Sequence, residues 1–376
     1  MINLLYIPIS VLISYNEYLI NGLHELGIRV YVDKPNTPLG VLTYIYEKMQ
    51  GRLKGKLLPT YAMPRELHNS YLKKLIKRGS VHVIHLNDLN TPLEVLRVGK
   101  EAGIPIVFVL HAAPIPEETY RQISDFIDLY IAPSRFTLSV EKEKIGGKGA
   151  VIIHHGIDVN EFKPMPKGYA RRKLGFAIDN KIVLWNDRIS PEKDIKTFLE
   201  AIPIVLKENR NIIFYIKGRA VVKNYYSEIK SLIKNPRIKP HVKLHIGWKR
   251  HKNLPYIYNA ADIFVRTSLY ENFGLGYIEA MACGIPVIAP NLTTAPEVIG
   301  DAGLLFTPGD PNDLADKVIK LLSNDELRKN LSSKSIKRVN EHFRYDIMAM
   351  KYREIYHKLL ADAPCRQGRY IQGSIL

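Results

Sequence analysis

Cysteine is almost missing from this sequence: its 376 residues include only two, Cys283 and Cys365. So few cysteines argue against a disulfide scaffold and favour a reducing compartment, so we expect a cytoplasmic location. Long hydrophobic runs are missing too, and without about 18 consecutive apolar residues no transmembrane helix is expected. Residues 1–6 carry no basic leader and are expected to form a first strand, not a signal peptide.

Acidic residues are few relative to basic ones: 37 Asp and Glu stand against 54 Lys and Arg, a formal net charge of +17. The excess gathers at residues 48–78, with nine basic residues against one acidic, and at 207–252, with thirteen against two. Such charge attracts polyanions, whether nucleic acid, anionic lipid head groups or phosphorylated substrates, and it also fits a solvated surface. No zinc-ligand spacing, RNA-binding sheet signature or heptad repeat accompanies it, so a nucleic-acid module is the weaker interpretation.

Short apolar segments alternate with helix-period segments along the whole chain. Strands are expected over residues 2–7, 28–32, 81–85, 104–110, 129–132, 150–153, 182–185, 212–217, 241–246, 262–266, 287–289 and 304–306. They are rich in Ile and Val, lack polar alternation and are separated by helical segments, which indicates parallel sheets covered on both faces. The fold class is therefore α/β, with two doubly wound, Rossmann-like domains.

A polar, proline-marked stretch at residues 160–168 is typical of a linker. We therefore expect a first domain over 1–165 and a second over 166–344. The helical run at 345–361 is expected to return to the first domain, and the tail at 362–376 is a candidate for disorder. Residues 33–63 are expected to form an irregular basic lobe of the first domain. Ligands of such sheets bind outside the carboxyl ends of the strands, so we expect a cleft there.

The stretch at residues 269–288 predicts a strand end, a glycine-bearing turn, a short helix and a buried strand. Gly274 and Gly276 let a ligand approach the main chain. The helix start points N–H groups and its positive dipole end at an anion such as a diphosphate. Glu271 and Glu279 can accept hydrogen bonds from sugar hydroxyls. A nucleotide-sugar satisfies both halves of this pattern and is the central hypothesis.

Other candidates also follow predicted strands. Ser190-Pro191 is expected to open a helix, and the flanking Arg188 and Lys193 can reach an anion there, although both could be solvated surface cations. Gly218 ends a predicted strand, where it could let a ligand approach the backbone or simply form an ordinary turn. Glu297 opens a predicted short helix, where it could contact a ligand or simply be an acidic residue favoured by the helix dipole. His111 ends a strand of the first domain, where a lone histidine is most often structural.

In this order and register, these motifs closely resemble glycosyltransferase family 4, retaining enzymes of the GT-B fold with a Glu-x7-Glu motif, here Glu271 to Glu279. The resemblance covers most of the chain from about residue 105. It also includes Ile131-Ala132-Pro133-Ser134, His155-Gly156-Ile157-Asp158, Asn259-Ala260-Ala261-Asp262 and Pro308-Gly309-Asp310.

The resemblance implies a hexosyltransferase that moves sugar from a nucleotide-diphosphate-sugar, UDP- or GDP-linked, to a hydroxyl acceptor that is a glycan, lipid-linked or a small molecule. It implies no metal and no further cofactor, because fixed cations stabilise the charge that develops on the leaving diphosphate. The implied roles are as follows: Arg188 and Lys193 on the diphosphate, Glu271 and His111 at the donor sugar, Glu279 on the ribose hydroxyls, and Asn272, Phe273, Gly274, Leu275, Gly218 and Glu297 as further donor contacts.

The sequence also departs from the family pattern. Residues 8–14 lack the usual glycine-rich loop, Asp187 stands where a glycine commonly precedes the arginine, Asp194 where one commonly follows the lysine, and His155 where asparagine is common. A sugar-nucleotide epimerase or hydrolase, or a non-catalytic nucleotide-sugar-binding or scaffold protein, therefore remain as alternatives. The basic stretch 48–78 further suggests peripheral docking on the anionic inner face of a membrane, or binding of a polyanionic acceptor.

Overall fold

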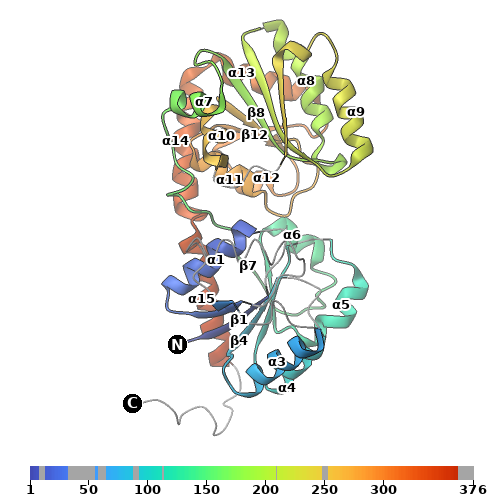
Figure 1. Ribbon diagram of the computed structural model, residues 1–376, viewed down its shortest axis with the longest axis vertical. Coiled ribbons are helices and arrows are strands. Elements are labelled where there is room, and N and C mark those ends of the chain that lie inside the picture. The colour runs from blue at the N-terminus through green and yellow to red at the C-terminus, as the bar shows by residue number, and fades with distance from the viewer. Residues whose placement is uncertain are drawn as a thin grey trace. The chain divides into compact units, whose positions relative to one another are not determined.

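The computed structural model describes residues 1–7, 13–32, 56–57, 65–87, 93–111, 114–208, 210–247 and 253–362 (Figure 1). The chain divides into two compact units. Unit 1 comprises Met1–Gly156 and Tyr345–Leu376, and unit 2 comprises Ile157–Arg344. None of the helices in the described ranges is both long and apolar enough to cross a membrane.

Unit 1 is built on a seven-stranded parallel sheet in the order β3-β2-β1-β4-β5-β6-β7. Its β4 and β5 are buried at every position, which explains why β5 appears in the sequence as an unbroken apolar run and β4 as an apolar run interrupted only by His85. The strands are β1 (Asn3–Ile7), β2 (Arg29–Val32), β3 (Lys56–Leu57), β4 (Val83–Leu86), β5 (Ile106–Val109), β6 (Leu129–Ala132) and β7 (Ala150–Ile152).

Helices cover both faces of this sheet (Figure 1). They are α1 (Ile13–Glu25), α3 (Arg65–Lys77), α4 (Leu93–Glu101), α5 (Glu117–Ile123), α6 (Arg135–Glu141) and α15 (Tyr345–Asp362), with a 3-10 turn η1 (Ser124–Phe126). The final helix α15 lies in this unit, where the hydroxyls of Tyr15 on α1 and Tyr352 are 2.9 Å apart. Strand β3 falls inside the stretch predicted to be irregular, and it pairs with β2 through Tyr31 and Lys56. The rest of that basic stretch, residues 33–55 and 58–63, lies outside the described residues.

Unit 2 is built on a six-stranded parallel sheet in the order β10-β9-β8-β11-β12-β13. The strands are β8 (Lys181–Ile189), β9 (Ile212–Ala220), β10 (Val242–Ile246), β11 (Ile263–Val265), β12 (Val287–Pro290) and β13 (Gly303–Phe306). The strands β8, β9 and β10 follow one another toward one edge of the sheet. The chain then returns to the other side of β8, where β11, β12 and β13 follow one another toward the opposite edge. The switch point of the topology therefore lies between β8 and β11, where such sheets bind ligands.

Two groups of helices flank this sheet. On one side lie α8 (Ile195–Glu208), α9 (Lys223–Ile233) and α13 (Pro311–Ser323), and on the other α7 (Lys167–Leu174), α10 (Leu254–Ala260), α11 (Leu275–Ala282) and α14 (Asp325–His342) (Figure 1). Short elements complete the unit: η2 (Pro191–Lys193), η3 (Lys239–His241) and α12 (Ala295–Ile299). Trp185 and Phe198 are among the fully buried side chains at the centre of its core.

The structure divides the chain at residue 156, earlier than the boundary predicted at 165. The proline-marked stretch is attached to unit 2 because Asn259 hydrogen-bonds it at both sides. The Asn259 side-chain amide donates to the Lys163 carbonyl at 3.0 Å, and its oxygen accepts from the Met165 N–H at 2.9 Å. Phe162 is buried beside the Tyr258 ring, with ring centroids 6.2 Å apart. A stretch with linker-like composition is therefore packed surface of the second unit.

Candidate functional site

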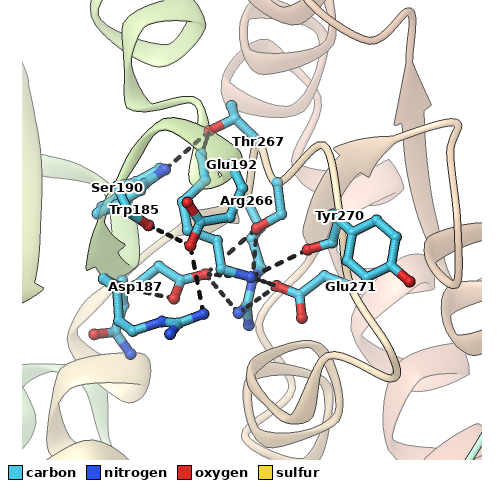
Figure 2. Close-up of polar contacts among 12 residues, drawn as sticks. Trp185, Asp187, Ser190, Glu192, Arg266, Thr267, Tyr270 and Glu271 are labelled. Carbon is cyan, nitrogen blue, oxygen red and sulfur yellow. Dashed lines mark hydrogen bonds and ion pairs between the residues drawn. The ribbon is translucent and has the colours of Figure 1, made fainter. Parts of the chain in front are cut away.

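The loops that follow β8 and β11 meet at the switch point of unit 2. The two strands are direct neighbours, with Trp185 opposite Val265. Thr267 joins the loops: its hydroxyl donates to the Lys193 carbonyl at 2.9 Å and accepts from the Trp185 indole at 3.1 Å. The Leu269 N–H donates to the Glu192 carbonyl at 2.9 Å. These bonds hold the residues around Lys193 against those around Glu271 (Figure 2).

Two carboxylates and two cations are buried together at this switch point (Figure 2). Lys193 Nζ lies 2.6 Å from Glu271 Oε1 and 3.9 Å from Asp187 Oδ2. Arg266 Nη2 lies 2.5 Å from Asp187 Oδ2 and 2.6 Å from Glu271 Oε1. The four side chains are only 5 to 10% exposed. Each buried charge thus has an opposite charge in contact with it, as stable burial requires.

These contacts fix the ionisation of the cluster. Burial alone favours the neutral form of Glu271, but Arg266 and Lys193 outweigh it and hold the pKa of Glu271 below its usual value. Burial likewise disfavours the charged guanidinium, but the Asp187 and Glu271 carboxylates outweigh it and raise the pKa of Arg266. Glu271 is therefore an ionised carboxylate at neutral pH, able to accept hydrogen bonds from a ligand.

Glu279 has different surroundings on α11. The Tyr258 hydroxyl on α10 donates to its Oε2 at 2.7 Å, and the Asn186 side-chain amide on β8 donates to the Tyr258 oxygen at 3.3 Å. Burial, followed by the charge of Glu279, raises the pKa of Tyr258 well above its usual value, so the phenol keeps its proton. Tyr258 is thereby a fixed hydrogen-bond donor that orients the Glu279 carboxylate.

Helix α11 begins directly after a turn at Gly274. Gly274 has φ +87°, a left-handed conformation that glycine adopts readily. The Thr294 hydroxyl holds the turn by donating to the Phe273 carbonyl at 3.0 Å. The first N–H groups of a helix have no acceptor within it, so those of Leu275 and Gly276 mark an anion-favouring end beside the charged cluster.

The other predicted residues of unit 2 lie around this cluster. The Arg188 side chain is 54% exposed and 3.5 Å from Glu192 Oε1, so it stands outside the buried group. Gly218 pairs with Asp187 across β9 and β8, and a Cβ there would lie 2.8 Å from Ile189 Cδ1, so the packing against Ile189 favours a glycine. Glu297 opens α12, and its backbone carbonyl accepts from Arg338 at 2.7 Å.

His111 belongs to unit 1, where it is buried just after β5. Its Nε2 lies 2.8 Å from Asn87 Oδ1, the same oxygen that lies 3.1 Å from His85 Nε2. The other nitrogen of His85, Nδ1, lies 2.5 Å from the Tyr356 hydroxyl of α15. Burial, followed by the neighbouring His155 and His85, holds the pKa of His111 well below its usual value. His111 is therefore a neutral imidazole at physiological pH.

Sequence reasoning missed Arg266 and Tyr258. The sequence places Arg266 at the end of the predicted strand 262–266 and marks Asp187 only as a difference from the family pattern. One signal could have identified Arg266: it is a charged residue directly after the buried run Ile263–Val265, and a buried charge needs a partner. Within the described ranges, no group of three or more His, Cys, Asp or Glu side chains gathers as a metal site would require.

The fold is that of the GT-B glycosyltransferases. A glycosyltransferase from Rickettsia africae matches with a TM-score of 0.79 at 19% identity, over 96% of this chain and 99% of that chain. Anabaena HepE, solved with UDP and glucose, also matches with a TM-score of 0.79, at 20% identity over 95% of this chain and 100% of that one.

Two family models match the chain. "Glycosyltransferase Family 4" matches residues 14–161 and "Glycosyl transferases group 1" matches residues 167–338. Together they span nearly all of the sequence from residue 14 to residue 338. The chain therefore belongs to glycosyltransferase family 4.

Curated relatives carry several transferase names. The chain is 40% identical over 92 residues to the O-antigen chain mannosyltransferase B of Escherichia coli, covering 24% of each protein. It is 28% identical over 213 residues to the N-acetyl-alpha-D-glucosaminyl L-malate synthase of Bacillus anthracis, covering 56% of this chain and 54% of the relative. These matches thus span from about a quarter to about half of each relative's length.

Proposed function

We propose that the protein transfers a hexose from a UDP- or GDP-linked sugar to a hydroxyl acceptor, with retention of anomeric configuration and without a metal ion. The observation that carries this proposal is the buried cluster at the β8–β11 switch point, where the ionised Glu271 contacts Lys193 at 2.6 Å beside the start of α11. A diphosphate requires fixed positive charge and N–H groups, and a sugar requires fixed acceptors. The cluster and the adjoining start of α11 offer all of them.

The donor would lie with its diphosphate at Lys193, Arg188 and the first N–H groups of α11. Glu279, oriented by Tyr258, would accept hydrogen bonds from the ribose, and Glu271 from the donor sugar. The roles of Gly218, Glu297 and the backbone of residues 272–275 as donor contacts, and of His111 at the donor sugar, stay predictions from the family resemblance.

The reaction breaks the bond between the anomeric carbon and the diphosphate oxygen and forms a bond from that carbon to the acceptor oxygen. The acceptor proton passes to an oxygen of the departing diphosphate on the same face of the sugar. Charge grows on the diphosphate as its bond breaks, so cations already in place stabilise the transition state more than the ground state. Fixed side-chain charge thereby takes the place of a metal ion.

The test combines donor binding with product analysis. Calorimetry with UDP, GDP and their hexose derivatives should show binding of one series, and chelator treatment should leave both binding and transfer unchanged. Proton NMR of the glycoside should show the donor's anomeric configuration. Failure to bind any nucleotide would contradict the proposal. Release of free sugar or an isomerised nucleotide without acceptor would instead support a hydrolase or an epimerase.

We also propose that the basic stretch 48–78 docks the protein on an anionic membrane. Residues 48–55 and 58–64 lie outside the described residues, while α3 carries Lys74 and Lys77 in its last turn. Each Lys or Arg near an anionic surface contributes about 1 kcal/mol. Sedimentation with phosphatidylserine vesicles but not with phosphatidylcholine vesicles is expected, and equal binding to both would rule out an electrostatic cause. A cytoplasmic location stays a prediction.

A further inference from the structure

Arg266 is a buried cation of the site, with its side chain only 10% exposed, and its surroundings restrict what it can do. Its Nη2 is shared between Asp187 Oδ2 at 2.5 Å and Glu271 Oε1 at 2.6 Å. Its Nε donates to the Ser268 hydroxyl at 3.3 Å, and its guanidinium carbon lies 5.3 Å from the centre of the Tyr277 ring. The guanidinium is thus held by two carboxylates, a hydroxyl and an aromatic ring.

We propose that Asp187 and Arg266 form a charge pair that positions the Glu271 carboxylate for the donor sugar, with Arg266 a positioning residue and not a diphosphate ligand. The inference rests on the proposed function, because it specifies how the sugar-binding carboxylate of that site is held. It assigns a role to two residues outside the Glu-x7-Glu motif and the Arg188 and Lys193 pair.

The orientation of Glu271 follows from its cation contacts. Lys193 and Arg266 both contact the same oxygen, Oε1, each at 2.6 Å. Two donors on one oxygen restrict rotation of the carboxylate and direct Oε2 away from them. A sugar hydroxyl that meets Oε2 then finds an acceptor already in place, so less orientational freedom is lost when the donor binds.

The pair is also required by charge balance. With Asp187 and Glu271 negative and Lys193 and Arg266 positive, the buried group is neutral. Removing Arg266 alone leaves two carboxylates with one lysine, and removing the Asp187 charge alone leaves two cations on one carboxylate. Removing both leaves Lys193 with Glu271, a balanced pair. Asp187 adds a second buried carboxylate beside Glu271, and Arg266, which contacts both, is the counter-ion that this second carboxylate needs.

The chain also provides room for Arg266. A Cβ at Gly276 would lie 2.5 Å from Arg266 Nη1, so a side chain at this position would displace the guanidinium. Gly276 is in the first turn of α11, close to the helix end that favours anions. The cation can remain there because Asp187 and Glu271 neutralise it.

The test compares a ligand with and without sugar. The variants are Arg266→Met, Asp187→Asn and the double variant, with calorimetry against UDP and UDP-glucose, and against GDP and GDP-mannose. Arg266→Met should weaken binding of the nucleotide-sugar about tenfold, the scale of one hydrogen bond to a charged group, and change binding of the nucleoside diphosphate less than about threefold. The double variant should recover most of the loss.

Arg171→Met is the matched control, because Arg171 and Asp262 also form a buried pair of the same unit, 2.7 Å apart and each 5% exposed. Asp262 precedes β11, at the opposite end of the strands from the site. This variant should unfold at a lower temperature and keep the native ratio of nucleotide-sugar to nucleoside-diphosphate affinity. A changed ratio in Arg171→Met would mean that any loss of a buried pair alters the site and would overturn the assignment.

Two further results would overturn the proposal. Equal losses for UDP and UDP-glucose in Arg266→Met would make Arg266 a diphosphate ligand. A double variant at least as impaired as Arg266→Met would show that Asp187 and Arg266 do not act as a pair.

The pH dependence of binding gives a further readout. As the pH falls, Arg266→Met should lose its affinity for the nucleotide-sugar at a higher pH than the native protein does, because Glu271 has lost one of its two cations.

If the native protein binds no nucleotide, the proposed function fails and the charge pair is still tested by thermal unfolding. The double variant should then unfold at a higher temperature than Arg266→Met, because it no longer buries an unbalanced carboxylate. An equal or lower midpoint for the double variant would overturn the pair independently of any ligand.

Discussion

The carboxylates of Glu271 and Glu279 differ in the groups that contact them. Glu271 contacts two cations at 2.6 Å each, which keeps it ionised and fixed. Glu279 receives a hydrogen bond of 2.7 Å from the Tyr258 hydroxyl. Tyr258 is a neutral donor, so this hydrogen bond orients the Glu279 carboxylate without itself neutralising the negative charge.

Substitution of Tyr258 by Phe should therefore weaken nucleotide binding without removing the carboxylate. The loss of one hydrogen bond to a charged group predicts a dissociation constant about tenfold higher for UDP or GDP. Tyr256→Phe is the matched control in the same helix, since the Tyr256 ring packs beside Tyr169, with centroids 6.0 Å apart. Calorimetry checks both. Equal affinities for Tyr258→Phe and Tyr256→Phe would show that Tyr258 has no part in the site.

The limits of sequence reasoning are visible at single residues. Glu271, Glu279 and Lys193 could be singled out because their spacing forms a known pattern. Arg266 could not, because its partner Asp187 lies in another strand and only the sheet order brings the two side chains to 2.5 Å. Gly218 could be singled out from the sequence, but the structure also gives it a packing role, because it lies close to Ile189.

At the scale of elements, the start of α11 is both part of the fold of unit 2 and part of the candidate site. Its first turn lies beside the charged cluster, and Gly276 leaves the volume that the Arg266 guanidinium occupies. Gly276 is not among the residues with positive φ, so the backbone there accepts alanine. Only the missing side chain distinguishes this glycine from an ordinary helix position.

Gly276→Ala should thus damage the site more than the fold. Alanine raises helix propensity by up to about 1 kcal/mol, but its Cβ would displace Arg266 and weaken nucleotide-sugar binding about tenfold. Gly168→Ala in α7 is the control, because the nearest atom to its Cβ would be Arg172 Nη1 at an ordinary 3.5 Å. Titration of both variants with nucleotide-sugar checks this, and native affinity in Gly276→Ala would contradict it.

Helix α15 completes the core of unit 1 through aromatic and imidazole groups. Tyr352 meets Tyr15, and Tyr356 meets His85 at 2.5 Å. Burial lowers the pKa of His85 to about 3, and burial, followed by His154, lowers that of His155 to about 3. These histidines are neutral in the folded protein, while an unfolded chain protonates them below about pH 6.5.

Acidification should therefore destabilise the protein before its carboxylates titrate. Protons bind the unfolded chain more readily, so each such histidine lowers the free energy of unfolding by about 2 kcal/mol between pH 7 and pH 5. His155→Asn should remove about that much of the pH dependence. Urea unfolding at pH 7, 6 and 5 measures it, and identical pH dependence in the variant and the native protein would refute this account.

The elements that sequence predicted well are those buried on both faces. The apolar runs of β4, interrupted only by His85, and of β5 could be placed because a central parallel strand needs no polar face. Strand β3 has only two residues, and α7 has a largely polar sequence, Lys-Gly-Tyr-Ala-Arg-Arg-Lys-Leu, so neither gave a periodic signal. Their formation depends on tertiary partners, for example the buried Arg171 contact with Asp262.

At the scale of the whole molecule, two doubly wound units divide the chain at residues 156 and 344. The alternation of strands and helices was sufficient to predict two such units. It did not place the first boundary, because Phe162 and the Asn259 hydrogen bonds attach the proline-marked stretch to unit 2. Family membership accounts for the architecture of the two units.

The central claim is that unit 2 binds a nucleotide-sugar donor at the β8–β11 switch point. Its most direct test is a thermal-shift panel of nucleoside diphosphates and their sugars on the native protein and Glu279→Ala. A ligand at about 100 times its dissociation constant adds roughly 2.7 kcal/mol of stability, which raises the unfolding midpoint measurably. The account predicts a rise with one nucleotide series that is reduced in Glu279→Ala. No rise with any nucleotide, or an equal rise in both proteins, would contradict it.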